Sequence, residues 1–358
     1  MRTILLTIIL VISNIVSAQK DTSKSNLTFT GYVEFYYCYD FSNPQDHVRP
    51  FFIYNYNRHN ELNLNLGFLK ANYSSDNIRS NFALMAGTYA QYSLSGEQGL
   101  LRNVYEANTG MKISKKNNIW IDAGIMPSHI GFESAIGKDN YNLTRSIVAD
   151  NTPYYECGAK LGYTSKNEKL YLAAMYLNGW QRIQRIPGNQ TPAFGTQFTY
   201  KTDSTITLNW STFVGNEQPD SLAKWRYYNN FYLQFQVTEK FGIIAGFDIG
   251  MQQKNHASSD YNMCYSPTVN IQYKITHKIN IAARGEYFSD INGILIPTAT
   301  PNGFQTSGYS LNFDYKIRDN AVWRIEGRTL NSKDKIFSKD NDAMNTNTII
   351  TTALAISF

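Results

Sequence analysis

The chain has 358 residues and a formal net charge of +5 at pH 7, and 42% of its residues are hydrophobic and 14% aromatic. The positive charge is small and dispersed along the chain, which argues against a nucleic-acid-binding protein. The three cysteines are an odd number, which argues against a disulfide framework.

The first residues have the features of a secretory signal peptide. Arg2 precedes an apolar run that extends to Ile12, and Val16 and Ala18 fit the small-residue rule of a signal peptidase site. The apolar run is shorter than the roughly 20 residues of a membrane-spanning helix, which argues against an N-terminal anchor. We therefore expect residues 1–18 to be removed and residues 19–358 to form one domain.

An alternation of polar and apolar residues begins near residue 27 and continues to the C-terminus. In a β-strand such alternation places successive side chains on opposite faces. In "LTFTGYVEFYYCYD", for example, Phe35 and Tyr37 fall on one face and Glu34 and Asp40 on the other. We predict sixteen strands, at residues 27–40, 58–73, 78–92, 102–114, 118–126, 153–165, 169–180, 193–201, 205–215, 226–238, 241–253, 262–275, 279–289, 305–317, 320–330 and 346–358.

The connections between the predicted strands alternate between short and long. The short ones are polar turns, namely "SSDN", "SKKNN", "SKNEK", "KTDS", "TEK", "THK" and "RDN". Short turns at one end and long loops at the other are typical of a transmembrane β-barrel. A soluble sandwich would also alternate, but its strands are usually only about 5 to 6 residues long. We therefore expect an all-β fold, a closed antiparallel barrel of about 16 strands with short periplasmic turns and long extracellular loops.

A barrel of this size is wide enough to hold an aqueous channel. On the predicted register, one strand face is apolar and would contact lipid, whereas the other carries charges of both signs. These charges could set an electric field across the pore, or could neutralise one another and keep the lumen wet. The predicted pore-lining residues are Arg102, Glu106, Lys112, Asp122, Asp248, Arg284, Glu286, Arg324, Glu326 and Arg328.

The longest connection covers residues 127–153. Loops of more than about 12–15 residues are uncommon in compact folds and are usually functional or disordered. This loop carries apolar residues that can pack, such as Ile136 and Ile147. It could fold into the barrel and narrow the pore, or form an ordered external lid. As a constriction it would present Glu133, Lys138, Asp139, Arg145 and Asp150 to a permeating solute.

Two stretches carry a family resemblance, "YNRHNELNLNLGFLKANY" and "GIMPSHIGFESAIGKDNYNLTRSIVADNTPYYECGAKLGY". They resemble the putative β-barrel porin family of Bacteroidetes outer membranes, the OmpL-like group. The resemblance is best over residues 27–180, and beyond them only the strand pattern persists. It implies an outer-membrane porin and supplies no catalytic motif and no defined substrate.

The sequence carries no recognisable catalytic or metal-binding motif. A barrel lipase would need a Ser–His pair with an orienting acid or amide. Ser128 and His129 are adjacent, but "PSHIG" is not a nucleophile elbow, and His-x-x-x-His and Cys-x-x-Cys spacings are absent. We expect no enzyme activity, no metal and no cofactor.

The short stretch between the expected cleavage site and the first strand leaves no room for the plug domain of a gated receptor. We predict an outer-membrane porin, a water-filled channel for passive diffusion of small polar solutes. Alternatives are a receptor or adhesin, or a selective transporter of hydrophobic compounds. The latter is suggested by tyrosines near the first external loop, although aromatic residues are also expected where barrel strands meet the membrane interface. These tyrosines are Tyr36, Tyr37, Tyr54 and Tyr56.

The chain ends on "TTALAISF", which places Ile350, Leu354 and Phe358 on the predicted lipid face. By resemblance to other outer-membrane barrels, a last strand that ends in Phe looks like the signal read by the barrel-assembly machinery. We also expect contacts with outer-membrane lipid and lipopolysaccharide. The pattern leaves the oligomeric state open and is compatible with a homo-oligomer.

Overall fold

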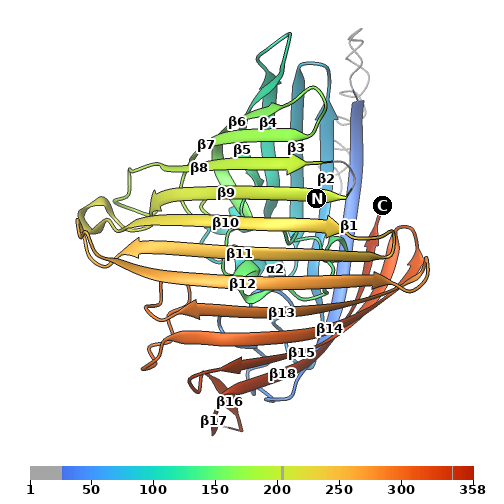
Figure 1. The fold of residues 1–358 in the computed structure, drawn as a ribbon, viewed down its shortest axis with the longest axis vertical. Helices are drawn as coiled ribbons and strands as arrows, with labels where there is room; N and C mark the ends of the chain where they lie inside the picture. Colours follow the sequence, from blue (N-terminus) through green and yellow to red (C-terminus); the bar gives the residue numbers. More distant parts are fainter. Residues whose placement is uncertain (1–25, 203–204, 341) are drawn as a thin grey trace, which may run out of the picture.

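In a computed structural model, which describes residues 26–202, 205–340 and 342–358, the chain forms a closed barrel of sixteen antiparallel strands (Figure 1). Each strand pairs with its neighbours in the sequence, and β1 pairs with β18 to close the sheet. Closure leaves no unpaired strand edge, as a β-structure in lipid requires. The expected signal peptide, residues 1–18, lies outside the described residues.

The barrel strands are β1 (Asn26–Asp40), β2 (Leu62–Ser74), β3 (Ile78–Ala86), β4 (Val104–Lys112), β5 (Asn118–Pro127), β6 (Tyr155–Thr164), β7 (Leu170–Leu177), β8 (Ala193–Lys201), β9 (Ile206–Asn216), β10 (Trp225–Gln236), β11 (Phe241–Gln253), β12 (Tyr261–Lys274), β13 (Ile279–Asp290), β14 (Phe304–Arg318), β15 (Ala321–Ser332) and β18 (Thr346–Ser357). All sixteen predicted strands are therefore present, and the predicted bounds of β8 and β11 are confirmed.

Two segments differ from the predicted strands. Residues 87–92 were expected to extend the third strand, but the chain turns at Gly87 and continues as the helix α2 (Thr88–Ser93). Gly87 has a φ of 121°, and a Cβ there would lie 2.4 Å from the backbone oxygen of Asn65, so only glycine fits the turn. The last loop contains a small hairpin that the alternation did not predict, formed by β16 (Phe337–Lys339) and β17 (Asp342–Met344).

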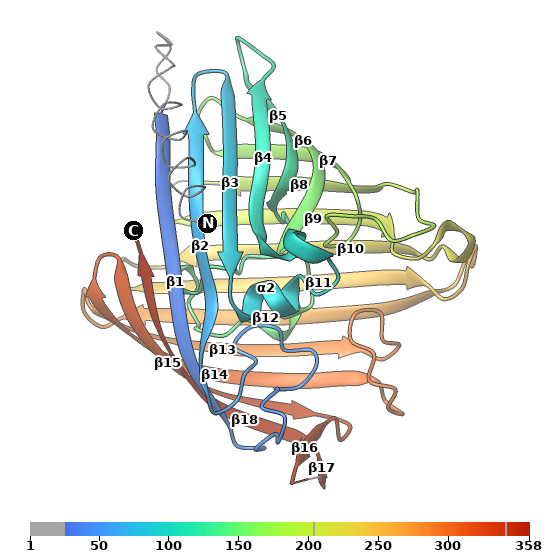
Figure 2. The same ribbon diagram turned by 180° about the vertical axis from the view of Figure 1, so that it is seen from behind.

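The short turns gather at one end of the barrel, the turn end, and the long connections gather at the other, the loop end. Strands of opposite walls cross in projection, as β1–β5 and β8–β12 do in Figure 2, because barrel strands are tilted relative to the axis. Among the described residues, no helix is long and apolar enough to cross a membrane. The loops used below are L1 (41–61), L2 (87–103), L3 (128–154), L4 (178–192), L6 (254–260), L7 (291–303) and L8 (333–345).

Polar and apolar side chains separate by strand face, as predicted. On β14, Leu311 is 73% exposed on the outside of the barrel, whereas its neighbour Asn312 is only 4% exposed on the inside. The same alternation places Phe231 and Trp323 outside and Asn230 inside. The apolar band therefore faces outward, where a membrane would cover it, and the polar side chains face the interior.

The C-terminal residue completes the seam between the first and last strands. The backbone N–H of Phe358 donates to the oxygen of Gly31 at 3.0 Å, and the N–H of Gly31 donates back at 2.6 Å. The Phe358 ring covers Gly31 so closely that a Cβ at that position would require the ring to move. The terminal aromatic thus belongs to the barrel wall and points away from the interior.

Candidate functional site

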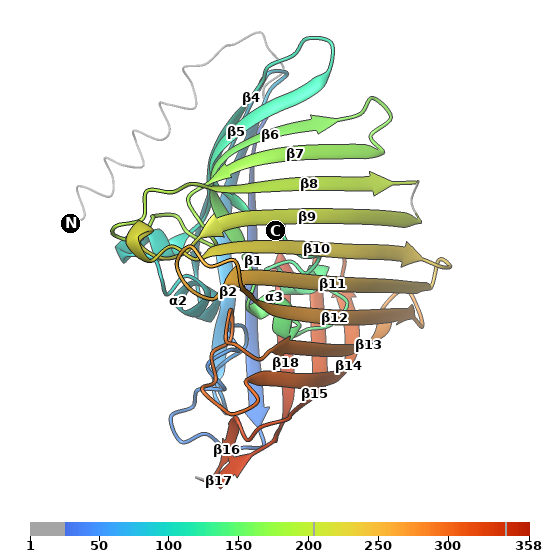
Figure 3. The same ribbon diagram turned by 60° about the vertical axis from the view of Figure 1, so that its left-hand side comes forward.

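L3 lies inside the barrel, and its α3 (Ile147–Asp150) sits between the two walls in Figure 3. Its backbone contacts residues in the middle of wall strands. Leu143 N–H donates to the Asn312 side chain at 3.1 Å, and Ile147 N–H donates to the Glu286 carboxylate at 2.6 Å. Of the two arrangements expected for this loop, the structure has the one that folds into the barrel.

Arg324 on β15 holds the first half of L3. Its guanidinium donates to the carbonyl oxygens of Gly137 at 2.6 Å, Tyr141 at 2.9 Å and Asn140 at 3.0 Å. It also pairs with Asp314 at 2.6 Å. The side chain is buried, and a guanidinium can satisfy several acceptors at once because its five N–H groups point in fixed directions.

Two further buried side chains, Glu326 and Arg284, hold Thr144 of L3. The Glu326 carboxylate accepts from the Thr144 N–H at 2.6 Å and from its hydroxyl at 2.7 Å. Arg284 donates to the Thr144 carbonyl oxygen at 2.6 Å and pairs with Glu326 at 3.2 Å and with Glu133 of L3 at 3.5 Å. Buried charges are tolerated when they are paired and hydrogen-bonded in this way.

The opposite wall holds the start of L3 through His129. Its Nδ1 lies 2.8 Å from Glu156 and its Nε2 lies 2.7 Å from the Thr212 carbonyl oxygen, so both ring nitrogens face acceptors. Burial by itself lowers the pKa of His129, but Glu156 and the Thr212 carbonyl outweigh it and the net pKa is raised. Gly131 N–H also donates to Asn230 at 3.1 Å. L3 therefore crosses the interior from one wall to the other.

Five predicted pore-lining residues form this anchoring network. Each lies on the inward face, as the register predicts, but each is buried and not exposed to an open lumen; four contact L3 directly, and Arg328 pairs with Glu286. Their role in permeation therefore stays a prediction, whereas the contacts of the first four show that they position the loop, and Arg328 supports Glu286. They are Arg284, Glu286, Arg324, Glu326 and Arg328.

Three other predicted pore-lining residues lie on the inward face away from most of this network. Glu106 pairs with Lys70, and Asp122 pairs with Arg79 at 2.6 Å. Asp248 accepts a hydrogen bond from Asn230 at 3.0 Å. Glu106 and Asp122 are thus already paired with cations of the wall, whereas Asp248 is hydrogen-bonded to a neutral amide.

The remaining two predicted pore-lining residues lie near strand ends. Lys112 is the last residue of β4, at the turn end of the barrel. For Arg102 the prediction of a strand position is wrong, because β4 begins at Val104 and Arg102 lies in the 3₁₀ helix η1 (Gly99–Asn103). Its guanidinium donates to the backbone oxygens of Glu97 at 2.6 Å and Ser95 at 3.0 Å.

The charged residues predicted to form a constriction have different environments. Arg145 is buried and donates to the carbonyl oxygens of Leu143 and Ala135, so it stabilises the loop from within. Lys138 and Asp139 pair at 3.2 Å and remain partly exposed. Asp150 is buried, and the foregoing contacts place Glu133 beside Arg284. Only part of the predicted charge set is therefore accessible to solvent.

Other loops also enter the loop end of the barrel. Phe52 of L1, Ile147 of L3, Ile296 of L7 and Phe337 of L8 pack together with Phe288 of the wall in one apolar cluster. Such a core inside a sixteen-stranded barrel was not expected from the polar alternation of the strands. It fixes the loops to one another and reduces the open space at this end.

Two cavities lie on opposite sides of L3 along the barrel axis. One, of about 300 Å³, is lined by Asp150 of L3 and by Arg226 near the loop end of β10. The other, of about 190 Å³, is lined by Asp139 and Tyr141 of L3 and by Gln234 near the turn end of β10. L3 therefore separates a loop-side cavity from a turn-side cavity.

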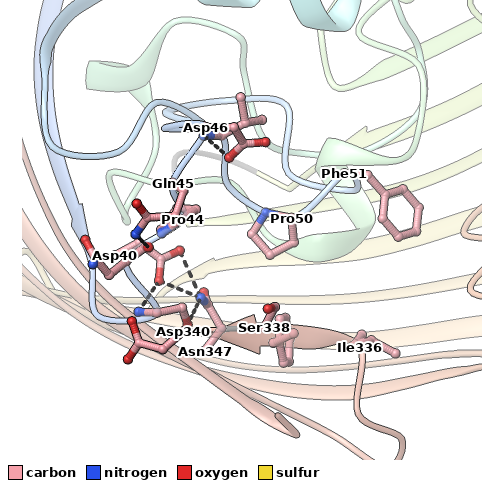
Figure 4. Close-up of a pocket in the computed structure, with 14 residues that line it drawn as sticks. Asp40, Pro44, Gln45, Asp46, Pro50, Phe51, Ile336, Ser338, Asp340 and Asn347 are labelled. Atoms are coloured by element: carbon pink, nitrogen blue, oxygen red, sulfur yellow. Dashed lines mark hydrogen bonds between the residues drawn. The ribbon is translucent and has the colours of Figure 1, made fainter. Parts of the chain in front are cut away.

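A third cavity, of about 580 Å³, lies at the rim between L1 and L8 (Figure 4). Asp40 is buried beneath it and accepts from Asn347 at 2.7 and 2.9 Å. Arg49 approaches the same carboxylate at 3.7 Å. Within the described residues, no group of three or more His, Cys, Asp or Glu side chains is arranged to hold a metal ion.

The sequence matches one protein-family model over all of its barrel strands. The family model described as "Putative beta-barrel porin-2, OmpL-like" matches residues 26–358. The chain belongs to this porin family. A comparison with curated proteins found no match.

Solved outer-membrane proteins have the fold of this porin at low sequence identity. OmpT of Vibrio cholerae is 10% identical with a TM-score of 0.60, over 95% of this chain and 100% of that one. An anion-selective porin of Comamonas acidovorans is 8% identical with a TM-score of 0.61, over 94% and 100%. The outer membrane channel DcaP of Acinetobacter baumannii is 12% identical with a TM-score of 0.61, over 95% and 99%.

Protonation of Asp150 makes the stability of L3 depend on pH. Burial raises the pKa of Asp150 to about 6, although a hydrogen bond from Asn55 and the charges of Arg328, Arg145 and Arg49 lower it. A raised pKa means that the folded loop favours the protonated carboxyl. This contribution to stability is complete below the unfolded pKa of about 3.9 and is lost as pH rises through about 6.

We therefore expect L3 amides around residues 146–152 to lose protection from hydrogen exchange between pH 4 and pH 7, after correction for intrinsic exchange rates. The shift corresponds to a change on the order of 2 to 3 kcal/mol. Asp150→Asn should remove this part of the pH dependence, with His129 left unchanged as the internal reference. The same pH dependence in the variant and the native protein would contradict the assignment.

Proposed function

We propose that this porin forms a narrow water-filled channel for passive diffusion of small polar solutes across the outer membrane, with L3 as its constriction. The observation that carries the proposal is that L3 is fixed across the interior by buried ion pairs and has a solvent-sized cavity on either side. Solutes would pass along the edge of L3 between these cavities. We also propose that the protein is not an enzyme.

The size of the cavities predicts which solutes pass. Purified protein in liposomes should give rapid swelling with glycine and glucose and little swelling with a trisaccharide, because the cavities flanking L3 are about 300 and 190 Å³. Swelling at equal rates with all these solutes would indicate a wide pore. A failure to swell with any of them, with insertion verified, would favour a receptor or adhesin whose rim cavity binds ligand.

The orientation and the cellular partners are part of the same proposal. The turn end would face the periplasm, the loops would face outward against lipopolysaccharide, and residues 1–18 would direct export. OmpT of Vibrio cholerae has also been solved in a trimer form. A homo-oligomer of this porin is therefore proposed, to be tested by light scattering with detergent correction.

The C-terminal aromatic is proposed to be read by the barrel-assembly machinery. Phe358→Ser should lower the assembled fraction in outer membranes severalfold, while refolding of the purified chain in detergent changes less. Tyr309→Ser is a matched control, because Tyr309 is 64% exposed on the outer face and Phe358 is 66% exposed. Equal assembly of both variants in heat-modifiability gels would contradict a specific role for Phe358.

A further inference from the structure

The loop-side cavity is assembled from five loops, L1, L2, L3, L4 and L7, and from the barrel wall. Its volume of about 300 Å³ is at the lower end of the range for small-molecule sites. Polar and aromatic side chains share its lining. The residues used below are Tyr54, Tyr92, Asp150, Trp180, Arg182 and Arg226.

Asp150 brings a buried negative charge to this cavity when the pH is above its raised pKa of about 6. It is 5% exposed, and among the described residues its carboxylate accepts one hydrogen bond, from the Asn55 amide to Oδ1 at 2.6 Å. Asn55 is neutral, and among the described residues Asp150 takes part in no ion pair. Its second carboxylate oxygen is thus available to a donor in the cavity.

Arg226 brings a buried positive charge to the same cavity. It is 7% exposed and donates to the Gln252 side chain at 2.8 and 3.0 Å and to the Ile294 carbonyl oxygen at 3.1 Å. Its guanidinium also lies 5.2 Å from the centre of the Trp180 ring. These partners are all uncharged. Glu217 and Asp290 interact with the positive charge of Arg226, but among the described residues neither forms an ion pair with it.

The third charged residue of the lining differs in this respect. Arg182 lies 3.7 Å from Glu217, which supplies its counterion. The cavity therefore contains two buried charges of opposite sign that form no direct ion pair, either with each other or with another described side chain, although more distant charges act on both. Burying an unpaired charge is costly, and a ligand that carries both complementary charges would compensate both at once.

We propose that the loop-side cavity binds zwitterionic α-amino acids and short peptides on their way through the channel. The ligand carboxylate contacts Arg226, its ammonium group contacts Asp150, and its side chain packs against Trp180, Tyr54 and Tyr92. The proposal rests on the proposed channel function and names its solute class. It also explains why the two charges face one cavity without forming an ion pair.

Four alanine derivatives of nearly equal size test the proposal. L-alanine carries both charges, L-alaninamide only the positive charge, N-acetyl-L-alanine only the negative charge, and N-acetyl-L-alaninamide neither. Calorimetric titration of the detergent-purified protein should give a Kd for L-alanine at least about tenfold lower than for the other three, since each lost charge contact costs about 1.4 kcal/mol or more. Comparable affinities for all four compounds, or no binding of L-alanine, would overturn the proposal.

Two variants identify the groups that recognise each charge. Asp150→Asn should weaken the binding of L-alanine and L-alaninamide and leave the affinity for N-acetyl-L-alanine unchanged. Arg226→Gln should weaken the binding of L-alanine and N-acetyl-L-alanine and leave the affinity for L-alaninamide unchanged. Asp46→Asn, at an exposed loop position, and Arg185→Gln, at a partly exposed one, lie outside the lining of this cavity and are controls. Unchanged L-alanine affinity in both cavity variants, with the barrel folded by heat modifiability, would contradict the assignment.

The calorimetric readout does not depend on conductance. If L-alanine binds and the protein carries no current, the cavity assignment holds and the channel function fails. If the protein conducts and L-alanine neither binds nor reduces the current, the channel function holds and the cavity assignment fails.

Discussion

Deleting residues 132–146 and joining the ends with a short glycine linker is expected to raise single-channel conductance about two- to fivefold, because an unfilled sixteen-stranded barrel has a wide lumen. The deletion removes the part of L3 that contacts Arg324, Glu326 and Arg284. Water then reaches these wall charges and hydrates them, so the barrel itself should remain closed. The measurement is the step size in planar bilayers.

A matched control removes a loop segment that stays outside the barrel. Residues 255–259 of L6 are mostly exposed at the loop end, and their deletion should leave the conductance near that of the native protein. An L3 deletion with native or lower conductance, in protein shown to be folded, would mean that L3 does not limit the current.

Replacing Arg324 with Ala is expected to release the first half of L3 from the wall. The variant loses the contacts to three L3 carbonyl oxygens and leaves Asp314 without its partner. Breaking a buried ion pair of this kind costs about 3 to 5 kcal/mol. We expect faster hydrogen exchange over residues 137–146 and frequent transitions to a larger conductance.

Two further variants separate the geometry of Arg324 from its charge. Arg324→Lys keeps the charge but cannot reach several carbonyl oxygens at once, so it should restore L3 only in part. Arg318→Ala removes an exposed arginine at the turn end of β14 and should have no effect. Native exchange rates over residues 137–146 in Arg324→Ala would show that the loop is held by other contacts.

The barrel could be predicted from the sequence because each strand has lipid on one face and the polar interior on the other. Apolar and polar residues therefore alternate with a period of two. Leu311 and Asn312 are adjacent in the sequence and lie on opposite faces of the wall, and the polar turns mark where strands end. The alternation does not predict the structure correctly where the chain leaves the membrane-facing wall. There, Gly87 redirects the chain into α2, and Arg102 belongs to a 3₁₀ turn although the alternation continues through it.

The site could be predicted only in part. The period places Arg284, Arg324 and Glu326 on the inward face, but it carries no information about what lies against that face. Arg324 contacts L3 residues 182 to 187 positions away in the sequence, and most of the acceptors are backbone carbonyl oxygens, which any residue supplies. The apolar residues of L3 were the one signal that the loop packs inside.

Because these arginines are buried against L3, reversing their charge would not measure the effect of lumen charge on ion selectivity alone. Replacing Arg284 or Arg324 with Glu would place a second negative charge beside Glu326 or Asp314 and displace L3. A change in ion selectivity would then reflect loop release as well as lumen charge. Selectivity is better tested at Lys138 and Asp139, which remain partly exposed on L3.

Single-channel recording of the native protein in a planar bilayer tests most directly whether L3 constricts a water-filled channel. We expect discrete current steps that are small for a sixteen-stranded barrel and that grow when residues 132–146 are removed. A bilayer that stays electrically silent after insertion of folded native protein, and stays silent with the L3 deletion, would contradict the claim that L3 constricts a water-filled channel.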